Sequence, residues 1–221
     1  METTQHLRLQ IRAGKVLLPG DLMLPPEWKG LILFSHGSGS SSHSPRNQMV
    51  ASFLRKQGFG TLLFDLLTPE EDRYADNRFN IDLLTQRLIS ATLWVERLPE
   101  VQHAPLGYFG ASTGAASALR AAVQLPQVQA VVCRGGRPDM ATDELPRVEA
   151  PVLLLAGGLD TDVLRLNEQA FARLRCTKEL QVIPGATHLF EEPGKLAEVA
   201  AHAARWFNQH VHAPVVPAET I

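Results

Sequence analysis

The stretch "GYFGASTGAAS" (Gly107–Ser117) decides the fold. It contains Gly110-Ala111-Ser112-Thr113-Gly114, which matches the pattern G-x-S-x-G. An apolar run precedes this pentapeptide, and the alanine-rich segment after it is typical of a helix. A serine between strand and helix sits on a tight turn that requires small neighbours and lifts the hydroxyl clear of the backbone. The pattern predicts Ser112 as a nucleophile; the alternative is a small-residue helix start that packs closely on a sheet.

Short apolar runs alternate with longer helical segments along most of the chain. The runs are Leu31–His36, Thr61–Leu67, Leu106–Ser112, Val128–Gly135, Pro151–Gly158 and Glu179–Gly185. Because most of them are apolar on both faces, they are typical of strands in a covered parallel sheet. Apolar residues three or four positions apart predict helices in Ile81–Leu98 and from Leu196 to Trp206. The alternation predicts an α/β fold with a mostly parallel, doubly wound sheet.

The first thirty residues follow a different pattern. "HLRLQI" (His6–Ile11) alternates apolar and polar residues, and "VLLPGDLML" (Val16–Leu24) follows a turn that contains glycine. These features predict an antiparallel hairpin at the sheet edge. No internal repeat or long linker divides the chain, so we expect one domain over residues 1–210 and a flexible tail over 211–221.

The composition is ordinary for a soluble globular protein, with 45% hydrophobic and 20% charged residues. A formal net charge of −2 gives no basic footprint for nucleic acid. No apolar run approaches the ~20 residues that cross a bilayer, and the N-terminal segment lacks the apolar core of a signal peptide. Cys133 and Cys176 make no disulfide framework. We expect a cytoplasmic monomer or homodimer with neither nucleic-acid nor membrane partners.

A serine is a weak nucleophile unless a neighbouring base accepts its proton. His188, in the loop after the last predicted strand, is the candidate base. Asp160, in the loop after "VLLLAGG", is the candidate to orient the imidazole. Asp162 is its competitor; we favour Asp160 because Asp162 is better placed to cap the following helix. Reactive residues of such sheets lie just beyond the carboxyl ends of the strands, so these side chains are expected to meet.

With "SHGSG", "GASTG", "GGLDTDV" and "GATHLF", the chain resembles the α/β-hydrolases and most closely the dienelactone hydrolase-like family, over about Leu31 to Asn208. The resemblance implies eight strands with only the second antiparallel, and a triad for esters or lactones carried by Ser112, Asp160 and His188. Dienelactone hydrolases proper use a cysteine nucleophile, and the serine here argues against a dienelactone substrate. Cys133 cannot substitute, because it lies near the end of the following strand.

Acyl transfer places negative charge on a carbonyl oxygen, which two N–H donors stabilise. One predicted donor is the backbone N–H of Thr113, directly after the nucleophile. The resemblance places the other at Ser38, after His36 and Gly37. Glycine at position 37 lets the backbone approach a substrate closely. We interpret His36 as support for this loop, with substrate contact by His36 or Gly37 as the alternative.

The same stretch, "SHGSGSSSHSPRN" (Ser35–Asn47), allows two other interpretations. A phosphate cradle requires G-x-x-x-x-G-K-[ST], and no lysine lies in this stretch. His36 and His43 suggest a metal, but they have no cysteine or carboxylate nearby, so we predict no metal site. The part from Ser44 onward, with proline in the first turn, predicts the start of a helix.

Three further features bear on the substrate. The link over residues 134–150 is too short for a large cap domain. Thr68–Asn80 is a candidate cover whose Tyr74 would line an apolar wall, or else a solvated charged loop. Arg134 and Arg137 follow the sixth strand and are able to pair with a substrate carboxylate, although such arginines more often tie loops together.

These residues predict a serine hydrolase that cleaves small carboxylic esters through an acyl-enzyme. No cofactor is required by this chemistry. A thioesterase or an acyltransferase would use the same groups. A non-catalytic binding domain on the same fold is the alternative from another class, because a fold alone does not fix a function.

Overall fold

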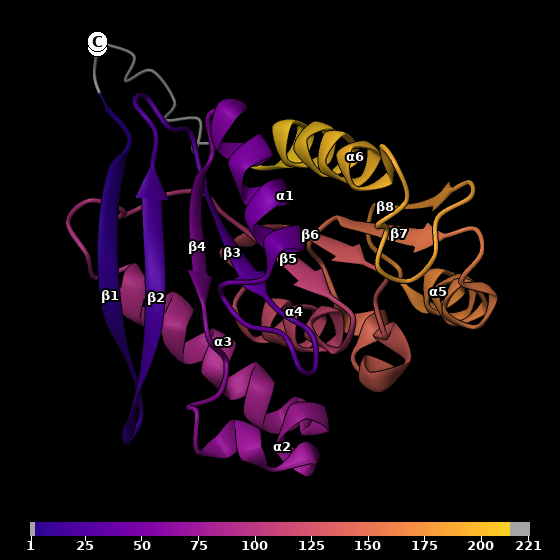
Figure 1. Cartoon of the computed structure of the whole chain (residues 1–221), viewed down its shortest axis with the longest axis horizontal. Coiled ribbons are helices and arrows are strands. Elements are labelled where there is room, and N and C mark those ends of the chain that lie inside the picture. The colour runs from indigo at the N-terminus through magenta and orange to yellow at the C-terminus, as the bar shows by residue number, and fades with distance from the viewer. Residues whose placement is uncertain (1–2, 213–221) are drawn as a thin grey trace, which may run out of the picture.

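A twisted sheet runs through the protein in the computed structural model, which describes residues 3–212 (Figure 1). Within these residues the strands are β1 (Gln5–Ala13), β2 (Val16–Leu24), β3 (Leu31–Ser35), β4 (Gly60–Phe64), β5 (Leu106–Ala111), β6 (Val128–Arg134), β7 (Val152–Gly157) and β8 (Lys178–Ile183). Their order across the sheet is β1-β2-β4-β3-β5-β6-β7-β8. Strand β2 pairs antiparallel with both neighbours, and all other pairs are parallel. The predicted edge hairpin and the single antiparallel strand are therefore confirmed.

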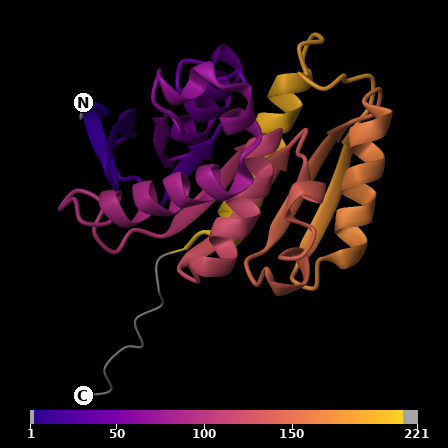
Figure 2. The same ribbon diagram turned by 90° about the horizontal axis from the view of Figure 1, so that it is seen from below.

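Helices cover both faces of this sheet (Figures 1 and 2). They are α1 (Pro45–Lys56), α2 (Ala75–Phe79), α3 (Ile81–Val95), α4 (Thr113–Gln124), α5 (Thr161–Arg173) and α6 (Lys195–His210), with short 3-10 helices η1 (Glu71–Arg73), η2 (Pro138–Ala141) and η3 (Leu145–Arg147). Helices α1 and α6 pack on one face, and α3, α4 and α5 pack on the other. This is the doubly wound architecture that the alternation of strands and helices predicts.

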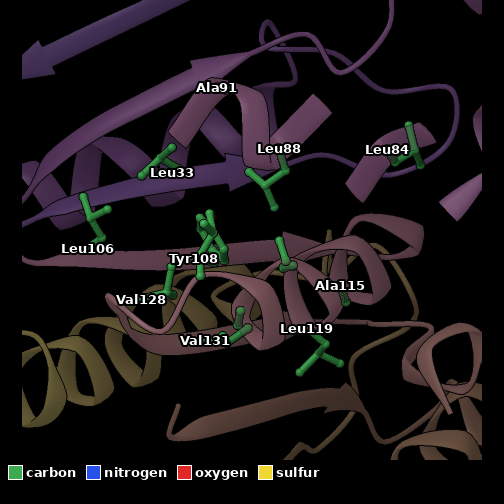
Figure 3. Close-up of a cluster of buried hydrophobic side chains, with 14 of the residues drawn as sticks. Leu33, Leu84, Leu88, Ala91, Leu106, Tyr108, Ala115, Leu119, Val128 and Val131 are labelled. Carbon is green, nitrogen blue, oxygen red and sulfur yellow. The ribbon is translucent and has the colours of Figure 1, made fainter. Parts of the chain in front are cut away.

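Two apolar layers hold the helices to the sheet. Figure 3 shows one of them, in which Tyr108 and Val131 of the sheet lie among Leu88 of α3 and Leu119 of α4. The Tyr108 hydroxyl, buried in this layer, forms a hydrogen bond of 2.6 Å with the Thr92 hydroxyl. Successive residues of a strand enter opposite layers, which explains why the central strands are apolar on both faces.

The predicted runs extend past the observed strands at their carboxyl ends. The run Thr61–Leu67, for example, leaves the sheet after Phe64. Residues beyond that point form loops at one edge of the parallel sheet, where such folds place their reactive groups. Between β6 and β7 only η2 and η3 intervene, so residues 3–212 form no large cap over this edge.

The residue that follows the C-terminal helix, Val211, packs against the segment that precedes β3. Val211 is buried and lies so close to Gly30 that a Cβ at position 30 would be 2.7 Å from it. Residues 213–221, most of the predicted flexible tail, lie outside the described residues. None of the helices within residues 3–212 has both the length and the apolar character needed to cross a membrane.

Candidate active site

The turn between β5 and α4 holds Ser112 in an unusual backbone conformation. Its φ of 50° and ψ of −122° are rare for a residue with a side chain and cost about 1–3 kcal/mol. A Cβ at Gly114 would lie 2.1 Å from the Ser35 carbonyl oxygen, and one at Gly110 would lie 2.6 Å from the Ala115 Cα. Both glycines are therefore required by the close packing of this turn, as the sequence pattern predicts. The serine directly precedes the N-terminus of α4, where the helix dipole is positive.

His188 and Asp160 come together at the same edge of the sheet. The His188 Nδ1 is 2.7 Å from Asp160 Oδ2, and the carboxylate is only 16% exposed. Asp160 occupies the N-cap position of α5 but makes no capping hydrogen bond, because its side chain is directed to the histidine. The expectation that Asp162 caps this helix is wrong: Asp162 lies in the first turn and is exposed.

Ser112 and His188 contact the same short segment after β6. The Ser112 N–H donates to the Arg134 carbonyl at 3.1 Å. A Cβ at the next residue, Gly135, would lie 3.5 Å from His188 Cε1. Among the described side chains no hydrogen bond joins Ser112 Oγ to His188, and such contacts are often long before a substrate binds. Ser112 and His188 therefore each contact one of two consecutive residues, Arg134 and Gly135.

The loop after β3 presses against the serine from the other direction. A Cβ at Gly37 would be 2.8 Å from the Ser112 Cβ, which leaves no space for a side chain at position 37. The Ser38 N–H donates to the Thr113 Oγ1 at 2.9 Å. The two predicted donors, Ser38 and Thr113, are thus adjacent, but the Ser38 amide is already bonded to the threonine hydroxyl. The sequence contained no sign of this contact.

His36 lies beneath this loop, buried from solvent. Its Nε2 accepts the Leu66 N–H at 3.0 Å, so its Nδ1 carries the proton and donates to the Gly37 carbonyl at 3.0 Å. Both ring nitrogens are used within the protein, which supports the interpretation of His36 as loop support. Burial lowers the pKa of His36 below its ordinary value of 6.5, and the Gly37 carbonyl and nearby Asp65 oppose this shift only in part.

Further hydrogen bonds fix the rest of the loop. Asp65 Oδ1 accepts the Ser42 N–H at 2.7 Å. The Ser44 hydroxyl caps α1 by accepting the Asn47 N–H, and Pro45 is in the first turn, as predicted. The side chain of His43 is exposed. The serine-rich stretch is therefore an ordered loop.

The segment Thr68–Asn80 lies beside the loop after β3. Asp72 and Arg78 form an ion pair, and both line a small hollow together with His36–Gly39. The Tyr74 side chain, however, is 64% exposed. Substrate contact by Tyr74 stays a prediction.

Of the two arginines expected after the sixth strand, only Arg137 follows it, because Arg134 is the last residue of β6. Arg137 forms a two-pronged ion pair with Asp139, with bonds of 2.9 Å and 2.7 Å, and ties its own loop together. Arg134 is buried and pairs with no carboxylate among residues 3–212. Cys133, one residue earlier, is fully buried, and burial raises the pKa of its thiol, which agrees with its exclusion as a nucleophile.

Sequence reasoning missed several supporting residues. The buried Asn167 of α5 donates to the Gly136 carbonyl at 3.0 Å and fastens the turn that carries the histidine contact. The hydroxyls of Ser35 and Ser117 share a hydrogen bond of 2.7 Å beneath the serine turn. Single polar residues within predicted strands and helices carry no sequence signal for such pairings. Within residues 3–212 no group of His, Cys, Asp or Glu side chains is arranged to hold a metal ion.

A sheet of this order, with a strained serine after β5, an acid after β7 and a histidine after β8, defines the α/β-hydrolase class. The sequence profile of the "Dienelactone hydrolase family" matches residues 21–212. The chain therefore belongs to the dienelactone hydrolase family. Its fold and family together support a hydrolase.

Individual proteins agree with this assignment. A structure described as dienelactone hydrolase from Anabaena variabilis is 48% identical, has a TM-score of 0.92 and covers 96% of this chain and 100% of its own. Est1E from Butyrivibrio proteoclasticus has the same fold at 16% identity, with a TM-score of 0.78 over 94% of this chain and 98% of its own.

Two Mycobacterium tuberculosis proteins, from strains CDC 1551 / Oshkosh and H37Rv, carry the name "Putative phosphoribosyl transferase". Each is 53% identical to this chain over 207 residues, which are 93% of this chain and 47% of the relative. The chain thus spans about half the length of these relatives.

The buried His36 predicts a pH dependence of stability. Because its folded pKa lies below 6.5, the unfolded chain takes up a proton first as the pH falls, and folding stability declines below about pH 6.5. The stability advantage of wild type over His36→Gln is expected to be full above pH 6.5 and to shrink as the pH falls through the lowered pKa. Urea unfolding at several pH values measures it.

His43→Gln is the matched control, because His43 is exposed on the same loop. It controls for the loss of one histidine from this loop. A difference between wild type and His36→Gln that stays constant from pH 7.5 to 5.5 would contradict the assigned burial of neutral His36.

Proposed function

We propose that this chain is a serine hydrolase that cleaves carboxylic esters through an acyl-enzyme. The observation that supports this best is the 2.7 Å contact between His188 Nδ1 and Asp160 Oδ2, together with the positive φ of Ser112 in its turn. An imidazole whose Nδ1–H is held by a partly buried carboxylate presents its Nε2 as a base, and the carboxylate stabilises the imidazolium that forms. A serine in such a turn with such a partner is the arrangement that acyl transfer requires.

The reaction proceeds in two displacements. The Ser112 Oγ attacks the ester carbonyl while its proton passes to the His188 Nε2, and a tetrahedral intermediate forms. Collapse of the intermediate releases the alcohol, which takes the proton from His188, and leaves an acyl group on Ser112. Water then attacks the acyl-enzyme, again giving a proton to His188, and the acid leaves with Ser112 restored.

The oxyanion is held at the junction of Ser38 and Thr113. The Thr113 backbone N–H starts α4 and adds the helix dipole to its own hydrogen bond. The Ser38 N–H reaches the Thr113 Oγ1, so the hydroxyl is free to donate its own proton to the oxyanion. In this arrangement Thr113 donates two hydrogen bonds to the oxyanion, one from its backbone N–H and one from its hydroxyl. The Ser38 N–H acts indirectly, because its hydrogen bond polarises that hydroxyl.

The edge of the site is apolar. Leu159 precedes Asp160 and Leu189 follows His188, and both leucine side chains are exposed. With no cap domain above them, these leucines offer an open surface for the carbon chain of an ester. We therefore expect substrates of modest size, and this surface indicates no preference for a particular chain length.

A thioester, or acyl transfer to another acceptor, would use the same residues. The name of the Mycobacterium tuberculosis relatives belongs to proteins about twice the length of the region they share with this chain. The proposal for this chain therefore rests on its own residues. A cytoplasmic location, a monomeric or homodimeric state, and the absence of cofactors and nucleic-acid partners belong to the same proposal.

Ser112→Ala should abolish both covalent labelling by a fluorophosphonate and hydrolysis of short p-nitrophenyl esters. The residual rate should be lower by about 10⁴-fold or more, because nucleophile and base act as a unit. Gel fluorescence and absorbance of p-nitrophenol are the measurements. Labelling that survives in the variant would exclude Ser112 as the nucleophile, and a folded wild type without labelling or turnover would favour a non-catalytic binding domain.

Asp160→Asn should lower kcat by about 10³–10⁴-fold with little effect on KM, because the imidazole loses the carboxylate that fixes its tautomer. Asp162→Asn is the matched control two residues away and should retain nearly full activity, since that side chain is exposed. Steady-state kinetics of both variants decides the assignment. A larger loss in Asp162→Asn would reverse it.

Thr113→Val removes the hydroxyl and keeps the shape of the side chain. We expect kcat to fall about 10- to 100-fold, between the loss of one neutral hydrogen bond and the loss of a complete oxyanion donor. Thr113→Ser, which restores a hydroxyl, should recover most of the rate. An unchanged or faster Thr113→Val enzyme would mean that the hydroxyl only occupies the Ser38 donor.

A further inference from the structure

Arg134, the last residue of β6, carries a buried charge without a partner. The residue is 7% exposed, and its Nε and Nη1 are shielded from water with no hydrogen-bond partner among the described residues. Its guanidinium carbon lies 5.9 Å from the centre of the Phe190 ring, which covers one face of the group and leaves its N–H edge without an acceptor. Buried charges in proteins are normally paired, because an unpaired one is costly.

A second guanidinium adds to this charge. Arg46, in the first turn of α1, forms an ion pair with Glu191 through Nη1. Its Nε is buried and has no hydrogen-bond partner within residues 3–212. Burial, and then the positive charge of Arg46, lower the pKa of Arg134 to about 10. At neutral pH both arginines remain charged, so the pair exceeds the single carboxylate of Glu191 by one positive charge.

The pair lies against the candidate active site. Val132 of β6 enters the layer under α1 and α6, and Cys133 enters the opposite one, so Arg134 follows Val132 to the α1 side. The Arg134 carbonyl accepts the Ser112 N–H, and Phe190 stands two residues after His188. The guanidinium therefore lies between the start of α1 and the histidine loop, on a residue whose backbone is hydrogen-bonded to Ser112.

Arg137 shows what a structural arginine looks like in the same turn. It is partly exposed and uses Nε and Nη2 in a two-pronged pair with Asp139. Among the described residues Arg134 has no such carboxylate partner, although its side chain is far better shielded from water. A structural tie explains Arg137 and does not explain Arg134.

We propose that Arg134, assisted by Arg46, binds an oxyanion carried by the ester substrate, either a carboxylate or a phosphate. This inference rests on the proposed esterase function and adds the substrate class to it. The planar N–H edge of a guanidinium matches two oxygens of either group. A substrate held there would be fixed at a point close to Ser112, and a neutral ester would leave the buried charge unpaired.

The test compares three p-nitrophenyl esters of similar length: monomethyl succinate, which is neutral; hemisuccinate, which carries a carboxylate; and 3-phosphonopropionate, which carries a phosphonate in place of phosphate. In wild type, kcat/KM for at least one charged ester should exceed that for the neutral ester by about 10- to 100-fold, as expected for charge-assisted hydrogen bonds. Which charged ester is favoured identifies the oxyanion.

The variants separate a binding role from a structural one. Arg134→Gln should lose the preference, and Arg134→Lys should retain part of it. Arg46→Gln should weaken it. Arg205→Gln, which breaks an exposed ion pair between Arg205 of α6 and Glu179 of β8, is the control and should keep the preference. A wild type that is labelled but shows no preference, or an Arg134→Gln with the wild-type ratio, would overturn the proposal.

Binding alone tests the subsite even if Ser112 proves unreactive. Calorimetric titration of wild type with inorganic phosphate and with succinate should show binding to at least one of them that Arg134→Gln loses and Arg134→Lys retains in part. No binding of either anion to wild type, or equal binding to Arg134→Gln, would refute the subsite independently of the catalytic assignment.

Discussion

The contact between the start of α4 and the end of β3 controls the geometry of the site. At Gly114 the helix comes so close to the Ser35 carbonyl that no side chain fits. This approach sets the direction of α4, forces the preceding Ser112 into a left-handed backbone, and brings Thr113 next to the loop after β3. The strain at Ser112, about 1–3 kcal/mol, is sustained by the two apolar layers on either side of the sheet.

The remaining parts of the site follow from the parallel sheet. Strands β3, β5, β7 and β8 run in one direction, so the loops that follow them meet at one edge. The loop after β3 gives Ser38, the loop after β7 gives Asp160 and the loop after β8 gives His188. Each side chain is then fixed by its own local contact, such as the pairing of His188 with Asp160. The sheet brings the groups together, and these contacts set their orientation.

Two buried basic side chains near the site, His36 and Arg134, show different responses to burial. His36 is kept neutral, with each ring nitrogen bonded to the backbone, and serves to hold the loop. Arg134 stays charged at neutral pH, and the Phe190 ring lies over one face of its guanidinium. An imidazole can give up its proton at little cost when buried, whereas a guanidinium cannot. His36 therefore has all its hydrogen bonds within the protein, whereas Arg134 would gain its missing acceptors from a bound oxyanion.

The sequence alone determined the fold class, the edge hairpin, the serine turn and the pairing partner of His188, because each is encoded in a contiguous pattern or in the order of residues along the chain. It also identified both glycines of the turn. It did not reveal that Thr113 Oγ1 takes the Ser38 N–H, that Asp160 stands at the N-cap where Asp162 was expected, or that Arg46 joins Arg134. Those outcomes depend on the distance and direction between side chains from separate elements. Only tertiary packing sets these, because hydrogen bonds and charge interactions form within a few ångströms and carry no periodic trace in the sequence.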